Sequence, residues 1–458
     1  MLLTMGEEES LNGACLELSI EDLTREGHGV ARHHGQVIFV PDALPGDRVR
    51  LRVVARKRHH WLGRLEAICT PSPQRRKPPC ILADHCGGCS LQSYSDNAQQ
   101  HWKRAHVEQC LQRLGGLVPT LRPLLTAAAA LGYRNRAVIP LERLTDGRLR
   151  AGYYRRGSHQ IVNMNHCPVL DPRLDALIAP LKADLEASGW PVDRHGRGLR
   201  HLALRLGQRS GELLLTLIAS EPHLPGLADL GRDWLRRWPE LVGVCLNLQP
   251  QPNNLLFGPE TRVIAGRGWL LERFADVELH IAADNFFQVN TAQAERVVAL
   301  LQEALGPADG LLLDAYCGIG TFALPLAARG WSVLGLELQA SAIALANRNA
   351  AHNGLQQRAR FQAGAVGDHL SALLNADPPA TAVLVDPPRK GLEPPALEAL
   401  RRQPPPRLAY LSCDPGTLAR DLGQLSGSEG PYRIDWLQPI DFFPNTSHVE
   451  CLAALTRR

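Results

Sequence analysis

The sequence has no apolar run long enough to cross a membrane. Its longest candidates, such as LLLTLIAS at 213–220, are only as long as a β-strand. The opening residues, MLLTMGEEES, also lack the basic start and the apolar block of a secretory signal peptide. These absences argue against a membrane-spanning or secreted protein and predict a cytoplasmic one.

Excess charge is also small. The 50 Lys and Arg residues and 46 Asp and Glu residues leave a net charge of +4, so the chain as a whole is not a polycation. Any affinity for nucleic acid must therefore come from local basic patches. Eleven cysteines, an odd number spread over 458 residues, argue against a disulfide framework. We expect these thiols to be reduced, bound to a metal or catalytic.

The length predicts about three domains. Residues 1–70 read as five short strands separated by Pro and Gly, which indicates a small OB-like β-barrel. One of these strands carries Arg48, Arg50 and Arg52 on the same face. This row is either a solvated strand face or a surface that follows RNA phosphates. Residues 71–284 form a central α/β domain after a basic, Pro-rich linker.

Residues 285–458 have a different pattern, in which predicted strands alternate with predicted helices of about ten residues. This alternation predicts a parallel, Rossmann-like sheet with helices on both faces. The last two strands are separated by a short link, which predicts an antiparallel hairpin at the edge of the sheet. Further basic residues lie in the central domain, at Arg134, Arg136, Arg155 and Arg156.

Several chemically active residue types follow the predicted strands of this last domain. Gly318 and Gly320 form a glycine turn that lets a ligand approach the backbone, and Glu337 ends the next strand at a spacing suited to ribose hydroxyls. These residues alone fit NAD enzymes and S-adenosylmethionine enzymes equally. Asp386-Pro-Pro after an apolar strand is typical of methyltransferases that act on bases or amides. Cys413 follows another buried strand.

Five motifs together resemble the RNA uracil-C5-methyltransferase family. They are NFFQVN (285–290), DAYCGIG (314–320), LVDPPR (384–389), LSCDP (411–415) and HVE (448–450). The likeness runs over nearly the whole chain, and residues 1–70 resemble the TRAM domain of RNA-modifying enzymes. With the barrel and a cysteine cluster included, the chain is most similar to the branch that methylates a specific uridine of 23S rRNA, the uridine-1939-type site.

The resemblance implies a role for each reacting residue. Cys413 adds to C6 of uracil, and the activated C5 then takes the methyl group. Glu450 removes the C5 proton, and Asp386 orients the uracil. The target uridine must leave its stack to reach the thiol. Family positions around S-adenosylmethionine are matched by Gln288, Tyr316, Gly318, Thr321, Glu337, Gly364 and Asp386. The family often has Asn at position 321 and an acidic or amide residue near 364, so this chain departs from it there.

The central domain carries a cysteine cluster near its start. Cys80, Cys86 and Cys89 lie in one glycine-containing stretch, and Cys167 lies far downstream before a proline. The spacing suits zinc or a four-iron cluster, and spacing alone does not separate them. The resemblance implies a 4Fe-4S cluster on these four residues, with a structural role or a contact to RNA.

Three alternatives remain open on the sequence. A NAD-dependent enzyme leaves Cys413 and Glu450 without a purpose, and so does a non-catalytic RNA-binding module. The third is the same reaction on another uridine of 23S rRNA or on tRNA, although the tRNA branch usually lacks the barrel and the cluster. We expect a monomer whose partner is 23S ribosomal RNA.

Overall fold

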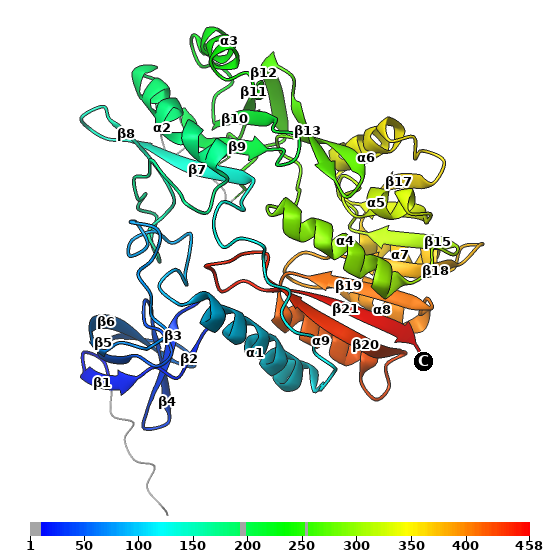
Figure 1. Ribbon diagram of the computed structural model, residues 1–458, viewed down its shortest axis with the longest axis horizontal. Helices are drawn as coiled ribbons and strands as arrows, with labels where there is room; N and C mark the ends of the chain where they lie inside the picture. The colour runs from blue at the N-terminus through cyan, green and yellow to red at the C-terminus, as the bar shows by residue number, and fades with distance from the viewer. Residues whose placement is uncertain (1–10, 193–197, 252–254) are drawn as a thin grey trace, which may run out of the picture. The chain divides into compact units, whose positions relative to one another are not determined.

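The computed structural model describes residues 11–192, 198–251 and 255–458 (Figure 1). The opening stretch MLLTMGEEES lies outside this range. No helix in the described part of the chain is long and apolar enough to span a membrane. Contacts divide the chain into two compact units. Unit 1 comprises residues 1–99 with 445–448, and unit 2 comprises residues 100–444 with 449–458. The division into three domains stays a prediction.

Unit 1 contains a six-stranded sheet in the order β1-β5-β6-β4-β3-β2. The strands are β1 (Cys15–Ser19), β2 (Asp22–Leu23), β3 (Gly29–His33), β4 (Gln36–Val40), β5 (Arg48–Arg56) and β6 (Trp61–Thr70). Strand β5 buries Val49, Leu51 and Val53 in the core of this sheet. Because side chains alternate along a strand, the arginines between them face away from the core. The row of three arginines is therefore on an outer face, as predicted.

Unit 2 begins with a mixed sheet in the order β12-β11-β10-β9-β7-β8. Its strands are β7 (Arg136–Arg143), β8 (Leu149–Ala151), β9 (Leu199–Leu206), β10 (Leu213–Ala219), β11 (Leu241–Leu248) and β12 (Glu260–Gly266). The helices α2 (Pro172–Ala187) and α3 (Leu227–Arg237) accompany it, and a hairpin of β13 (Trp269–Phe274) and β14 (Val277–Ala282) follows. This agrees with the predicted α/β character of the region.

The second sheet of unit 2 has seven strands in the order β17-β16-β15-β18-β19-β21-β20. They are β15 (Leu311–Ala315), β16 (Ser332–Glu337), β17 (Ala359–Ala363), β18 (Ala380–Val385), β19 (Arg407–Ser412), β20 (Tyr432–Ile440) and β21 (Glu450–Arg457). The first five are parallel, as predicted, and β20 and β21 form the predicted antiparallel hairpin.

That hairpin lies at the edge of the sheet, as predicted. Strand β21 inserts between β19 and β20, so the last strand of the chain is internal and β20 alone is the edge. The burial pattern explains this order, because the first six residues of β21 are all buried whereas β20 alternates with exposed residues in its first half. A strand that is buried on both faces is typical of the interior of a sheet.

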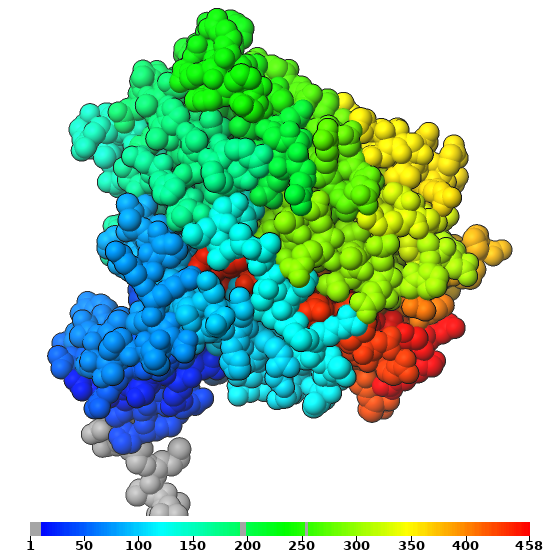
Figure 2. All heavy atoms as spheres, in the orientation of Figure 1, coloured from blue at the N-terminus to red at the C-terminus, as the bar shows by residue number. Residues whose placement is uncertain are grey.

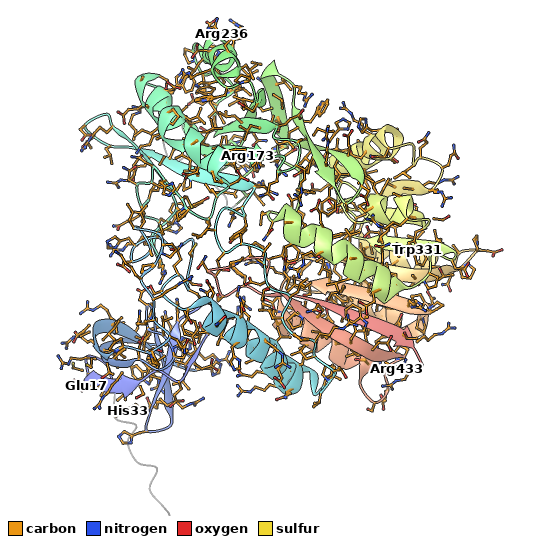
Figure 3. All side chains as sticks on the ribbon, viewed as in Figure 1. Glu17, His33, Arg173, Arg236, Trp331 and Arg433 are labelled. Atoms are coloured by element: carbon orange, nitrogen blue, oxygen red, sulfur yellow. The ribbon has the colours of Figure 1, made fainter. Side chains whose placement is uncertain are left out.

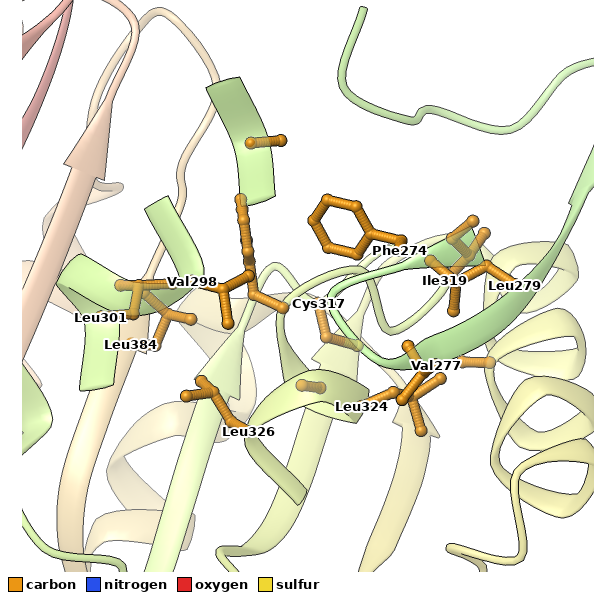
Figure 4. Close-up of a cluster of buried hydrophobic side chains, with 14 of the residues drawn as sticks. Phe274, Val277, Leu279, Val298, Leu301, Cys317, Ile319, Leu324, Leu326 and Leu384 are labelled. Atoms are coloured by element: carbon orange, nitrogen blue, oxygen red, sulfur yellow. The ribbon is translucent and has the colours of Figure 1, made fainter. Parts of the chain in front are cut away.

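Helices cover both faces of the seven-stranded sheet. On one face pack α4 (Thr291–Leu305), α5 (Ala323–Ala328) and α6 (Ala340–His352), and Figure 4 shows Val298, Leu324 and Leu384 in this core. On the other face pack α1 (Asp96–Gly115), α7 (Val366–Leu374), α8 (Pro394–Arg402) and α9 (Pro415–Ser426). The sheet is therefore enclosed, and its carboxyl edge is where ligands can reach it.

The exposed edge strand β20 is partly covered by the chain that follows α1. Leu121 pairs with Leu437 and Leu125 with Ile440 through isolated bridges, and in the space-filling view this cyan segment borders the red residues of β20 (Figure 2). Covering an edge in this way satisfies backbone groups that could otherwise pair with another chain.

Candidate active site

Three side chains that were predicted to react follow neighbouring strands of the seven-stranded sheet. Asp386 comes directly after β18, and Cys413 comes directly after β19. Strand β21 runs antiparallel to β19 and begins with Glu450. The register pairs Ser412 with Cys451, which places Cys413 and Glu450 at the same end of this strand pair. The structure thus brings all three to one edge.

The turn after β19 holds the thiol at the mouth of the sheet. Asp414 caps helix α9 by accepting hydrogen bonds from the backbone N–H groups of Gly416 (2.9 Å) and Thr417 (3.0 Å). The Ser412 hydroxyl donates to the carbonyl oxygen of Asp414 at 3.1 Å. Pro415 occupies the first turn of α9, where its missing N–H costs nothing. Cys413 is half-buried between these anchored residues.

Burial controls the protonation of the reacting groups. Burial, together with the negative charges of Glu450 and Asp386, raises the pKa of the Cys413 thiol to about 11. Burial also raises the pKa of Asp386 to about 7 and that of Glu450 well above its usual range. A carboxylate beside a protonated thiol is an arrangement that can accept a proton during a reaction.

Arg389 is a candidate site residue to which the sequence reasoning gave no role. It is exposed, and its charge lowers the pKa of both Cys413 and Glu450. Its carbonyl oxygen accepts a hydrogen bond from the Thr417 hydroxyl at 3.2 Å, which ties the loop after β18 to helix α9. A cation at this place can stabilise negative charge that develops on a ligand. The signal in the sequence was its place in the DPPR motif.

Asp314 is a second residue that the sequence reasoning passed over. It lies inside strand β15 and is only 2% exposed. Burial raises its pKa to about 8, with further contributions from Asp386 and Glu337. It is therefore an uncharged carboxyl group near neutral pH, directly beneath the glycine turn. An aspartate within the apolar stretch LLLDA was the available signal.

The glycine turn after β15 leaves room for a ligand. Gly318 and Gly320 have φ angles of 55° and 85°, in the left-handed region. A Cβ at Gly318 would meet no atom within 4 Å, so the backbone is open to close approach. Tyr316 also has a positive φ of 78°, and its hydroxyl is buried without a partner in the described residues. Thr321 is buried behind the turn.

The remaining predicted cofactor positions lie around the same edge. Glu337 ends β16, and its Oε1 accepts from the backbone N–H of Gln339 at 2.9 Å. Gly364 follows β17, and a Cβ there would lie 2.5 Å from the His369 ring. His369 thus occupies the space that a side chain at position 364 would need. Gln288 is buried, and its carbonyl oxygen accepts from Asn135 at 2.9 Å. That these residues hold S-adenosylmethionine stays a prediction.

The cysteine-rich stretch has the chemistry of a metal-binding loop. The backbone N–H of Leu82 donates to the Cys80 sulfur and that of Gly88 to the Cys86 sulfur, both at 3.4 Å. Such bonds stabilise thiolates that ligate metals. Cys89 lies in the same stretch in unit 1, whereas Cys167 is buried in unit 2. The described residues contain no group of three His, Cys, Asp or Glu side chains arranged as a metal site.

The arginine row of the barrel is paired with carboxylates. Arg50 forms an ion pair with Glu17 at 2.8 Å, Arg52 with Glu66 at 2.7 Å, and Arg48 lies 3.8 Å from Glu17. Glu17 projects from β1 on the exposed side of this sheet (Figure 3). The pairing lowers the pKa of Glu17, chiefly through its hydrogen bond with Arg50. This face therefore carries less net charge than its arginines alone suggest.

Comparison with known families identifies two parts of the chain. A family model described as tRNA (Uracil-5-)-methyltransferase matches residues 274–458, and the TRAM domain matches residues 9–65. An uncharacterized RNA methyltransferase of Parasynechococcus marenigrum is 50% identical over 450 residues, which cover 97% of this chain and 96% of that protein. A similarly described protein of Synechocystis is 46% identical over 448 residues, covering 97% and 96%.

Among solved structures, the chain resembles the Pyrococcus abyssi tRNA (uracil-54, C5)-methyltransferase in complex with S-adenosyl-L-homocysteine. The two share 27% sequence identity with a TM-score of 0.78. The match covers 96% of this chain and 100% of that one. The likeness therefore includes nearly the whole chain and extends well beyond the seven-stranded sheet.

Proposed function

This chain belongs to the RNA uracil-5-methyltransferase family with a TRAM domain and is an S-adenosylmethionine-dependent RNA methyltransferase. On that premise, we propose that it methylates C5 of a uridine through a covalent adduct with Cys413. The observation that carries the proposal is the meeting of Cys413, Asp386 and Glu450 at one sheet edge beside an open glycine turn. Neither a NAD enzyme nor a binding module needs a thiol and a base in register.

Each of these residues can be assigned a step of the methyl-transfer reaction that its surroundings favour. The Cys413 thiol gives up its proton to water and adds through its sulfur to C6 of uracil, which places negative charge on the ring and activates C5. Asp386 holds the ring, and the Arg389 guanidinium balances that charge. S-adenosylmethionine, when bound, supplies the methyl group that C5 takes. The Glu450 carboxylate then removes the C5 proton, and the C6–sulfur bond breaks to release 5-methyluridine and the thiolate.

The burial of Glu450 fits the role of a base. A carboxylate that is out of water and near another negative charge gains free energy by taking up a proton, which raises its pKa toward that of a useful acceptor. Its place at the start of β21, opposite the thiol, also puts it beside the ring that the thiol attacks.

We propose 23S ribosomal RNA as the substrate, on the sequence resemblance, with tRNA as the competing candidate. The expected absence of the barrel from tRNA enzymes gives weak discrimination, because the tRNA enzyme of P. abyssi aligns with 96% of this chain. The experiment is to map 5-methyluridine in ribosomal RNA and in tRNA from a deletion strain. Loss of one ribosomal site, restored by the wild-type gene and not by Cys413→Ala, is the expected result. Loss of a tRNA site would assign the alternative substrate.

We also propose that Cys80, Cys86, Cys89 and Cys167 ligate a 4Fe-4S cluster. The spacing, the N–H bonds to two of the sulfurs and the resemblance support it. Protein purified without oxygen should be brown and contain about four irons per chain. Cys167→Ser should lose the colour, whereas Cys69→Ser, an exposed barrel thiol, should keep it. Colourless protein with stoichiometric zinc would assign the other metal.

A further inference from the structure

Four residues just before Glu450 are packed with a distant part of the chain. By their contacts, residues 445–448 belong to unit 1, whereas the chain on both sides of them belongs to unit 2. Within unit 1 they meet the cysteine loop, which we define as residues 80–91. The chain thus leaves unit 2 and returns to it immediately before the residue that we propose as the base.

Backbone and side-chain hydrogen bonds hold this short segment to the cysteine loop. The N–H of Leu91 donates to the carbonyl oxygen of Asn445 at 2.9 Å. The N–H of Ser447 donates to the Ser90 hydroxyl oxygen at 3.1 Å. The Ser447 hydroxyl donates to the carbonyl oxygen of Arg25 at 2.8 Å. Ser90, which supplies one of these contacts, is the residue directly after the predicted ligand Cys89.

Asn445 is the most firmly fixed residue of the segment. It is fully buried and has a φ of 67°, a left-handed conformation that asparagine tolerates better than most residues. Its Oδ1 accepts from Arg76 Nη2 at 2.6 Å, and its N–H donates to Gln99 Oε1 at 2.9 Å. Ser447 is also buried, at 6% exposure. The segment therefore has little freedom to shift on its own.

Only two residues separate Ser447 from Glu450. A residue spans at most about 3.6 Å, so a displacement of Ser447 is passed on to Glu450 with little slack. Glu450 itself is anchored on its other side, where strand pairing places it opposite Ile440. The backbone of Glu450 is thus continuous with β21 on one side and joined through two residues to the segment 445–448 on the other.

We propose that Ser90 and Ser447 are positioning residues for Glu450, so that the cysteine loop fixes the geometry of proton removal from C5. This inference rests on the function proposed above and adds to it a link between the cysteine loop and one chemical step. A defect in this link should act after the thiol has attacked and the methyl group has been transferred. It should therefore leave the protein attached to RNA.

The test is to measure the covalent protein–RNA adduct and the turnover of Ser90→Ala, with bulk ribosomal RNA and tRNA as the RNA probes. Glu450→Gln is the reference that traps the adduct fully. Loss of the Ser90 acceptor should lower kcat about fivefold, the effect of one hydrogen bond, with an adduct that accumulates above the wild-type level. KM for S-adenosylmethionine should stay unchanged. Ser90→Thr keeps the hydroxyl and should restore turnover.

Ser95→Ala is the matched control. The Ser95 hydroxyl also makes a side-chain hydrogen bond in unit 1, to Gln74 Oε1 at 2.8 Å, away from residues 445–448. It should behave as wild type. Ser447→Ala keeps the backbone N–H that donates to Ser90 and loses the hydroxyl bond to Arg25, so it should accumulate less adduct than Ser90→Ala. A fall in thermal stability and rate without adduct in both serine variants would overturn the inference, because a purely structural role predicts that result. If Glu450→Gln traps no adduct, the base assignment itself is wrong.

Discussion

The catalytic edge of the seven-stranded sheet and the outer face of the barrel both gather charged groups on neighbouring strands, but in opposite states. At the edge, Cys413, Asp386 and Glu450 are withdrawn from water and their pKa values are raised by burial. On the barrel, Arg50 and Glu17 are exposed and paired. Buried groups of like charge store free energy that a ligand can release. Exposed pairs are already satisfied and gain little from a ligand.

A third region lies between these extremes. Arg136 of β7 stands opposite Arg205 of β9 in the strand register. Arg205 is 5% exposed and donates to the carbonyl oxygen of Asn285, and its Nε has no partner in the described residues. Burial lowers the pKa of Arg136 to about 10, although Asp284 opposes this. A buried and a half-buried guanidinium group with one nearby carboxylate favour an added anion, such as an RNA phosphate.

The largest effect is expected at the catalytic edge. Cys413→Ala should reduce methyl transfer to below about one ten-thousandth of the wild-type rate, because no other group can form the adduct. Binding of S-adenosylmethionine, measured by calorimetry, should stay near normal, since the thiol contacts the base. Cys69→Ala, which removes an exposed barrel thiol, serves as the control. Normal turnover of Cys413→Ala would show that the buried thiol is not needed for the reaction, and the catalytic edge would then differ from the barrel only in burial.

The raised pKa of Cys413 gives a second, more graded prediction. The rate of iodoacetamide labelling of the Cys413 peptide should rise with pH and reach half its maximum near pH 11. Glu450→Gln should move this midpoint down by about one pH unit, because it removes a negative charge that disfavours the thiolate. Mass spectrometry of the labelled peptide separates Cys413 from the other thiols. A midpoint near 9 in the wild type, the ordinary thiol value, would mean that the thiol is not buried in solution.

Much of the fold could be predicted from the sequence because its patterns are local. The alternation of apolar strands and helices after residue 285 indicated the parallel sheet, and Pro and Gly separated the barrel strands. The order of β20 and β21 within the hairpin was not predicted, because strand order depends on packing between distant segments. The hairpin link indicated that β20 and β21 pair, but it carried no information about which of them would lie beside β19.

The site was predicted in part for a similar reason. Motifs identified Cys413, Asp386 and Glu450, since each follows or starts an apolar strand. The partners of charged residues were not visible, because they come from other strands. Glu17 pairs with Arg50 through the register of β1 and β5, more than thirty residues apart. The alternating arginines of β5 could not by themselves reveal these partners. Asp314 was passed over because the motif that contains it was interpreted through the glycines that follow it.

A change in RNA binding of intermediate size is expected from substitution of Arg136, in the Arg136–Arg205 pair. Arg136→Gln should weaken binding of a labelled oligouridylate and flatten the dependence of its affinity on salt by about 0.7 on logarithmic scales, the value for one phosphate contact on a single strand. Arg136→Lys should keep most of that slope. Arg236→Gln, on α3 and 78% exposed, is the control for simple loss of charge. An unchanged slope with weaker S-adenosylmethionine binding would assign the pair to the cofactor carboxylate instead.

The smallest change in RNA binding is expected from the barrel arginines, and removal of a carboxylate there should strengthen binding. Three unpaired arginines would contribute a salt slope of about two on a single strand. Because Glu17 holds Arg50 and lies near Arg48, a phosphate has to displace a carboxylate first. Arg50→Gln should therefore change the slope by less than about 0.7, whereas Glu17→Gln should tighten binding and steepen the slope. The same oligouridylate titration measures both. If Arg50→Gln costs a full phosphate contact and Glu17→Gln gains nothing, RNA displaces the pairs freely, and the barrel face is then as ready for phosphate as the Arg136–Arg205 pair.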